Sequence, residues 1–144
     1  MSWLKQFQNL SNKSRWLLLE AVICLTFWQL VVKLLPFKWY HSYLGERTEN
    51  PQETTLPSTP TAKELRKAIY TASKYLPWQP VCFPQALAAK SMLKRRGTTG
   101  TFYFGASGKN PGKLIDLHVW LDCENQTITG GKTKHQFTVY RIYH

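Results

Sequence analysis

The sequence predicts an α+β domain in which helices come first and a small antiparallel sheet follows. The first observation is helical periodicity in two stretches, one from about Thr61 and one over about 82–96. The second is a change of period after Gly97, where short alternating runs begin. The third is the turn chemistry of "SGKNPG" and "ENQ", which separates these runs: 100–106, 113–123, 127–131 and 136–143.

Composition limits the size and class of the protein. The 144 residues leave room for one small domain and an appendage, but not for two ordinary domains. A hydrophobic share of 43% and an aromatic share of 14% exclude a wholly disordered chain. The net charge is +11, with +6 of it in residues 51–97, and this excess favours acidic partners. Three cysteines without a CxxC pair argue against a disulfide framework and favour a reducing compartment.

Residues 1–44 are expected to form an apolar N-terminal helical segment. The stretch "RWLLLEAVICLTFWQLVVKLLPF", residues 15–37, follows basic residues as a signal peptide does, but no small-x-small cleavage site comes after it. Glu20, Gln29 and Lys33 interrupt it without sharing one helical face, which counts against a simple span and a simple interfacial helix. Contact with a membrane and burial against a partner or the protein's own core are both open.

Residues 45–60 are predicted to be a flexible linker before a folded domain at 61–144. The linker, "GERTENPQETTLPSTP", holds three prolines and a single aliphatic residue, Leu56, which is too little apolar surface to offset the entropy of ordering. Thr61 and Glu64 then form a capping box that starts a helix. Its cations lie away from its apolar face as a solvated basic surface: Lys63, Arg66, Lys67 and Lys74.

The second helix is predicted to begin at Cys82, within "WQPVCFPQALAA". Pro84 is tolerated because first-turn N–H groups have no intrahelical partner. The run "KRRG" ends the helix, with cations at its negative end and Gly97 as terminator. The positive end of a helix favours thiolate over thiol, and its N–H groups can bind an oxyanion. Cys82 is therefore the candidate nucleophile.

His118, in "LHVW" at the centre of a predicted strand, is the candidate general base. A thiolate needs such a base to work in acyl transfer and to protonate the leaving amine. A helix-start cysteine facing a strand histidine is the arrangement of papain-like and transglutaminase-like hydrolases. Strand alternation places His118 on one face with three other side chains: Asp116, Trp120 and Asp122.

Purely structural roles for Cys82 and His118 compete with the catalytic one. A single cysteine is most often an inert core residue, and a single strand histidine is usually structural. A zinc site made of Cys82, Cys123, His118 and His135 lacks the spacing of ligand pairs, so neither a metal nor a cofactor is expected. The alternative function is a basic, non-enzymatic binding or scaffold module at a membrane or on nucleic acid.

In their order and spacing, several motifs resemble one family. "W…C…QALAAKSMLKRRG", then an aromatic strand, then "LHVW" with an acidic residue two positions on, then "TGG", resemble the lasso peptide biosynthesis B2 proteins. The resemblance covers Trp78 to about Phe137, and the apolar N-terminal stretch also resembles the lead-in of these proteins. It implies a papain/transglutaminase-like core, with the catalytic helix packed on a small antiparallel sheet. It also implies a cysteine peptidase that removes the leader from a ribosomally made precursor peptide.

Carried over by motif, the resemblance makes Cys82 the nucleophile and His118 the base. The family's third catalytic residue is expected about a dozen positions after the histidine, where this chain has "TGG" at 129–131 and no carboxylate. Asp116, on the His118 face, is the expected third member, and Asp122 is a weaker candidate. A backbone carbonyl or the threonine hydroxyl of the "TGG" run is a further alternative.

The resemblance also implies partners and a location. Leader recognition is expected in a separate small protein, because the residues before Thr61 leave no room for such a module. A lasso cyclase is expected to close the ring on the freed amine. The basic middle region offers a docking surface for the leader-binding partner or for an acidic peptide, and no nucleic acid is expected. The expected location is the cytoplasm, with or without membrane attachment through residues 15–37.

Overall fold

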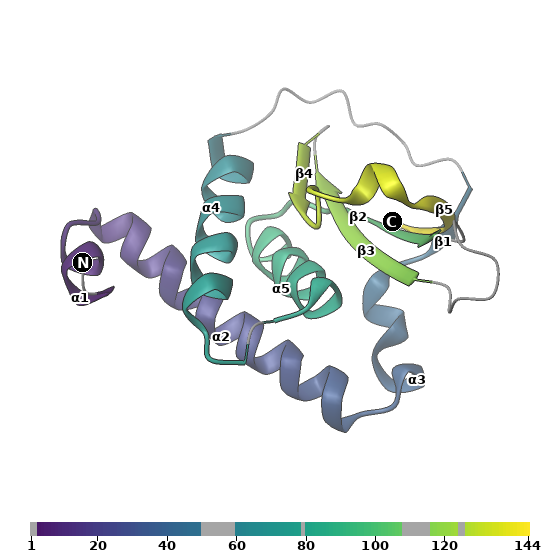
Figure 1. Ribbon diagram of the computed structural model, residues 1–144, viewed down its shortest axis with the longest axis horizontal. Coiled ribbons are helices and arrows are strands. Elements are labelled where there is room, and N and C mark those ends of the chain that lie inside the picture. Colours follow the sequence, from purple (N-terminus) through teal and green to yellow (C-terminus); the bar gives the residue numbers. More distant parts are fainter. Residues whose placement is uncertain (1–2, 50–59, 79, 108–115, 124–125) are drawn as a thin grey trace.

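The computed structural model describes residues 3–49, 60–78, 80–107, 116–123 and 126–144. Within them, α-helices cover one side of a five-stranded antiparallel sheet of order β1-β5-β2-β3-β4, which confirms the α+β class (Figure 1). The helical elements are α1 (Trp3–Gln8), α2 (Asn12–Leu34), α3 (Phe37–Tyr40), the 3-10 turn η1 (His41–Leu44), α4 (Pro60–Tyr75), α5 (Cys82–Lys94) and η2 (Lys134–Gln136). The strands are β1 (Arg47–Thr48), β2 (Thr101–Ser107), β3 (Asp116–Cys123), β4 (Gln126–Thr129) and β5 (Thr138–Tyr143).

The predicted elements appear in the predicted order, with shifted ends. α4 begins at Pro60, so Thr61 lies inside its first turn instead of at the cap. α5 starts at Cys82 as predicted but ends at Lys94, before the predicted end near residue 96. Gly97, with φ +74°, follows as the helix terminator. β5 begins only at Thr138, because η2 occupies the start of its predicted run. The first residues of the predicted run 113–123 lie outside the described part of the chain.

α5 is the central element, packed against α2, α4, β3 and β4 (Figure 1). Its apolar side chains lie on every face, and Ala86 through Ala89 have no exposed surface at all. A helix that is apolar all round must be enclosed. The sheet encloses it on one side with Phe102 and Leu121, which are also fully buried.

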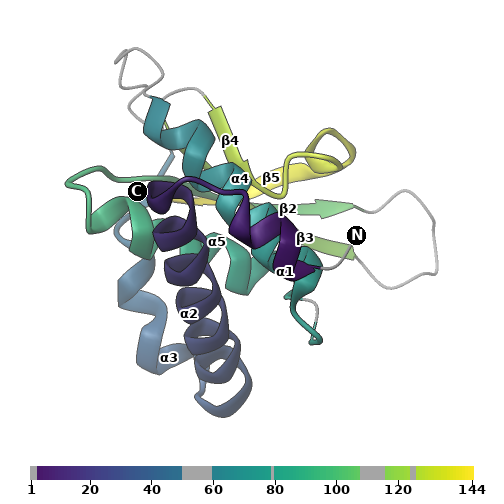
Figure 2. The ribbon, with the colours of Figure 1, turned by 90° about the vertical axis from the view of Figure 1, so that its left-hand side faces the viewer.

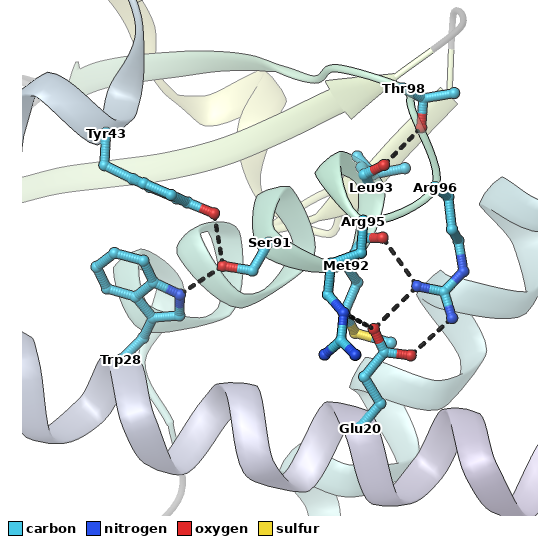
Figure 3. Close-up of polar contacts among 9 residues, drawn as sticks. All are labelled: Glu20, Trp28, Tyr43, Ser91, Met92, Leu93, Arg95, Arg96 and Thr98. Atoms are coloured by element: carbon cyan, nitrogen blue, oxygen red, sulfur yellow. Dashed lines mark hydrogen bonds and ion pairs between the residues drawn. The ribbon is translucent and has the colours of Figure 1, made fainter.

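α2 encloses α5 from the other side, along the outside of the molecule (Figure 2). Two polar connections fix the pair (Figure 3). Trp28 Nε1 donates a hydrogen bond of 2.7 Å to Ser91 Oγ, and the Tyr43 hydroxyl meets the same oxygen at 2.7 Å. Arg96 donates to both carboxylate oxygens of Glu20, at 2.9 and 2.6 Å. The acidic residue that interrupts the apolar stretch is therefore an anchor for the end of α5.

α2 also meets the length and composition of a membrane-crossing helix, and among the described helices it alone does so. A core helix passes the same test. Here one face of α2 is buried against the domain, through Leu17, Leu18, Ala21, Cys24, Leu25 and Trp28. The opposite face is exposed, so α2 is both a core helix and part of the surface.

The segment predicted to be a linker is structured at its start. Arg47 and Thr48 form β1 and pair with the end of β5, while residues 50–59 lie outside the described residues. Gly45 makes this pairing possible, because its φ is +101° and a Cβ there would lie 2.3 Å from the His144 carbonyl oxygen. The pairing partner is almost a hundred residues away, so no local pattern could have predicted this strand.

Lys90 is a cation in the middle of the buried helix. Its Nζ donates to the Leu44 carbonyl at 2.6 Å and lies 5.1 Å from the centre of the Phe102 ring, so it ties η1 to α5. Burial, with a smaller contribution from Lys94, lowers the pKa of Lys90 from 10.5 to about 8. The buried position of the Lys90 amine therefore favours its neutral form over its protonated form.

This burial predicts a pH-dependent stability. Between about pH 8 and 10.5 the unfolded chain holds the Lys90 proton more tightly than the folded protein does, so the contribution of Lys90 to the free energy of unfolding rises with pH in that window. The rise should be about 1.4 kcal/mol per pH unit, and Lys90→Met should lack it. Urea denaturation of both proteins across the window measures the difference. Parallel pH profiles for the two proteins would contradict the assignment.

Candidate active site

Cys82 is the first residue of α5, the position that the sequence predicts. The backbone of Val81 is extended at the N-cap, and the Gln85 amide turns back to the Val81 carbonyl at 3.3 Å. Pro84 has no N–H, so the amides of Cys82 and Phe83 are the first-turn donors without an intrahelical acceptor. They are the groups that can bind an oxyanion at this helix end.

Aromatic packing holds the start of α5 in place. The Phe83 ring lies 5.9 Å from the Phe104 ring of β2 and 6.2 Å from Tyr40, measured between ring centres. Cys82 itself is half-buried and packs against the core. The helix end that carries the thiol is therefore fixed to both the sheet and α3.

His118 lies near the start of β3, with its ring held on two sides. Phe137 stacks on it at 4.9 Å between ring centres, and Trp120 lies at 5.9 Å. His118 Nε2 lies 2.8 Å from the Gly130 carbonyl oxygen. A carbonyl can only accept, so Nε2 carries the proton and Nδ1 is the nitrogen left with a lone pair. The bond selects the tautomer that can take a proton at Nδ1.

Gly130 is the residue that permits this arrangement. Its φ is +71°, and a Cβ there would lie 2.7 Å from the Val119 carbonyl oxygen and 3.0 Å from His118 Nε2. Any side chain would push the backbone away from the imidazole. The position where the family resemblance places a carboxylate is therefore filled by glycine, whose backbone comes close enough to accept the bond.

The two aspartates considered for the third position lie apart from this bond. The Asp116 side chain is exposed, and within the described residues no hydrogen bond or ion pair joins it to His118. Asp122 lies 3.9 Å from Lys134, whose Nζ also donates a hydrogen bond to the Thr127 hydroxyl. Burial raises the pKa of the Asp122 carboxyl, against the opposing effect of Thr127 and Lys134. Asp116 as the third member stays a prediction.

A groove of about 750 Å³ connects the histidine with the start of α5. His118 and Gly130 line it from the sheet, while Pro80 and Gln85, which flank Cys82 in the chain, line it from the helix side. Gln85 is fixed there by a hydrogen bond from its Nε2 to the Pro80 carbonyl at 2.7 Å. The Cys82 side chain is not among the groove-lining residues, so the groove leads to the helix end without including the thiol.

The other two cysteines are core residues. Cys24 and Cys123 are buried, and burial raises the pKa of the Cys24 thiol. Among the described residues, no three His, Cys, Asp or Glu side chains converge as a metal site would require. Cys82 is thus the most accessible of the three thiols.

Sequence reasoning missed two supports of the histidine. Phe137 lies in a predicted strand, but no signal indicated that its ring would cover His118. Gly105 on β2 is needed because a Cβ there would come within 2.7 Å of Phe137 and 2.8 Å of Trp120. A glycine inside an otherwise aromatic strand was the only available clue.

Comparison with known proteins identifies the superfamily of this chain. The profile of the transglutaminase-like superfamily matches residues 31–141. The chain therefore belongs to the transglutaminase-like superfamily, whose fold is typically that of cysteine proteases. No curated protein and no solved structure matches it. The match begins inside α2, so the end of that helix is part of the superfamily domain.

The Gly130 bond predicts how two substitutions should differ. Gly130→Ala should displace the carbonyl from His118 and lower the free energy of unfolding by at least the roughly 1–2 kcal/mol that left-handed backbone costs a non-glycine residue. If the Gly130 carbonyl alone orients the imidazole, Asp116→Asn should change neither the free energy of unfolding nor the tautomer of His118. The ¹⁵N chemical shifts of the imidazole report the tautomer: Nε2–H in the native protein and in Asp116→Asn, and a tautomer mixture in Gly130→Ala. A mixture in Asp116→Asn with an unchanged Gly130→Ala ring would instead assign the orienting role to Asp116.

Proposed function

We propose that the protein is a cysteine peptidase that removes the leader from a ribosomally made lasso peptide precursor. The observation that carries the peptidase proposal is the bond between His118 Nε2 and the Gly130 carbonyl. It leaves Nδ1 as a base on a groove that leads to the helix end bearing Cys82. The choice of a lasso precursor rests on the ordered motifs from Trp78 to about Phe137.

The proposed reaction is a two-step acyl transfer. The Cys82 thiolate attacks the scissile carbonyl, and the amides of Cys82 and Phe83 bind the resulting oxyanion. The proton that His118 Nδ1 takes from the Cys82 thiol passes to the leaving amine as the C–N bond breaks, which leaves the leader as a thioester on Cys82. His118 then takes a proton from water, which attacks the thioester. The C–S bond breaks, the proton passes from His118 to the sulfur, and the leader acid and the free thiol are released.

The Gly130 carbonyl is the proposed orienting group in this reaction. It holds the Nε2 proton, so the ring presents Nδ1 throughout the cycle. A neutral carbonyl stabilises the imidazolium less than a carboxylate would, which predicts a slower enzyme than one with a full triad.

The proposed partners follow from the same function. A separate leader-binding protein presents the precursor, and a lasso cyclase uses the freed amine. The alternative, a basic scaffold in which Cys82 is only packed, draws support from the exposed cations of α4. The two proposals differ in whether the thiol is needed.

Cys82→Ala should abolish cleavage of a lasso precursor peptide, assayed by mass spectrometry in the presence of the leader-binding protein that recognises that precursor. His118→Ala should slow cleavage by roughly 10²–10⁴-fold, because the general base is removed. The matched controls are Cys24→Ala and Cys123→Ala, which should keep most of the activity because both thiols are buried in the core. Cleavage by Cys82→Ala at the native rate would overturn the peptidase proposal and favour the scaffold.

A further inference from the structure

The groove beside His118 is strongly basic. Five cationic side chains line it, four of them from the outer face of α4: Lys63, Arg66, Lys67, Lys74 and Lys132. These residues are called the basic groove below. No aspartate or glutamate is among the residues that line it. The helical surface that the sequence predicts to be merely solvated therefore borders the candidate active site.

The cations of the basic groove have no anionic partner within the described residues. The nearby acidic side chains are bound elsewhere: Glu64 pairs with Lys13 at 3.0 Å, and Asp122 lies 3.9 Å from Lys134. Five like charges around one hollow repel one another, and the folded protein leaves that repulsion uncompensated. An anionic ligand would relieve it.

The rest of the lining suits a polypeptide better than a nucleic acid. Ile69 and Ile128 give the groove buried apolar side chains, and Gln85 adds an amide. Two aromatic rings line the groove: Lys132 Nζ lies 5.1 Å from the centre of the Tyr70 ring, and Phe137 stacks on the His118 imidazole. Bases bound in single strands stack on open aromatic faces, and each of these two rings already has a partner on one face.

We propose that the basic groove binds an acidic stretch of the polypeptide substrate, through its aspartate and glutamate carboxylates. This inference deepens the proposed function and rests on it, because the bound peptide is a substrate only if the protein is a peptidase. An acidic stretch held along α4 would place the adjoining peptide bonds beside His118 and the start of α5. The charge would also steer the substrate to the groove, and salt would weaken this attraction.

The test measures binding separately from cleavage. Full-length Cys82→Ala is titrated with a fluorescein-labelled oligoglutamate peptide, and the oligoglutamine peptide of equal length serves as the uncharged control. The test variant adds Arg66→Glu and Lys67→Glu. The matched control adds Lys33→Glu and Lys38→Glu, which change the net charge equally but lie outside the groove.

The oligoglutamate peptide should bind selectively and in a salt-dependent manner. The groove reversal should weaken its binding by at least about tenfold, and the control by less than about twofold. In the Cys82 form, the groove reversal should raise KM for an acidic precursor and leave kcat nearly unchanged. Equal losses in both variants, absence of selectivity, or tighter binding of oligouridylate would overturn the proposal. If the basic groove binds the oligoglutamate peptide but the protein with Cys82 intact cleaves no precursor, the peptide-binding site is supported and the peptidase proposal fails.

A second surface is carried by a separate observation, the exposed face of α2. Six apolar side chains spaced three or four residues apart are between 43% and 73% exposed: Trp16, Leu19, Ile23, Phe27, Leu30 and Leu34. They are called the outer α2 face below. Glu20 does not disrupt this face, because it turns to Arg96. An exposed apolar surface of this extent marks an interaction site.

Charge and aromatic placement favour a lipid surface as its occupant. Exposed Lys5, Lys33 and Lys38 lie near the two ends of α2. Trp16 provides an exposed amphipathic ring near the start of α2, and Trp39 provides another just beyond its end. Basic and tryptophan side chains around an apolar face are typical of helices that lie in the interface of anionic membranes. The inner face of α2 is packed on α5, so the helix is available to lie along the membrane instead of crossing it. We infer that α2 attaches the domain in plane to an anionic bilayer.

Vesicle flotation tests this attachment. The full chain should float with vesicles of phosphatidylcholine and phosphatidylglycerol, and less with phosphatidylcholine alone. Ile23→Asp with Phe27→Asp should abolish flotation, whereas the control pair Val139→Asp with Tyr140→Asp, exposed on β5, should not. Circular dichroism verifies that each variant is folded. Flotation unchanged by the α2 pair, or a dimer in solution that this pair dissociates without any vesicle binding, would overturn the inference.

Discussion

The enclosure of α5 between α2 and the sheet governs how the other elements are placed. Its fully buried apolar side chains, Ala86 through Ala89, lie between α2 on one side and the sheet on the other. Ser91 then joins α5 to both Trp28 and Tyr43, and Arg96 joins its end to Glu20. Because the helix cannot shift between these layers, its first turn has a fixed place relative to β3. The position of the Cys82 thiol thus follows from packing a full helix length away.

The same packing explains why a glycine can serve beside the histidine. Gly130 follows the short strand β4, which lies at the sheet edge against α4 and α5. There the chain turns with positive φ and brings its carbonyl to His118, while Phe137 closes the ring's other side. The acceptor in this bond is a neutral carbonyl at a half-buried position, so no carboxylate has to be desolvated there. Tautomer selection is kept, and electrostatic support of the imidazolium is reduced.

Charge is distributed unevenly over the molecule. The acidic side chains Glu20, Glu64 and Asp122 are engaged by Arg96, Lys13 and Lys134, in pairs that hold elements together. The excess cations collect instead on the outer side of α4, next to the groove, whereas the outer α2 face is apolar and has exposed lysines near its two ends. With a peptide-binding surface on α4 and an apolar surface on the neighbouring α2, one small domain would hold its substrate while it is attached to a membrane.

Local sequence was enough to predict the helix-then-sheet order, the start of α5 at Cys82 and the place of His118 on a strand, because periodicity, proline position and turn residues are local properties. It also indicated that residues 129–131 offer only backbone or a hydroxyl to the histidine. Only the folded chain shows that Gly130 supplies the acceptor, that Phe137 covers the ring, and that β1 pairs with the end of β5. Folding also turns Glu20 into an anchor for Arg96 and leaves one face of α2 exposed. Each of these depends on contacts between residues far apart in the chain, whose geometry exists only once α5 has been enclosed.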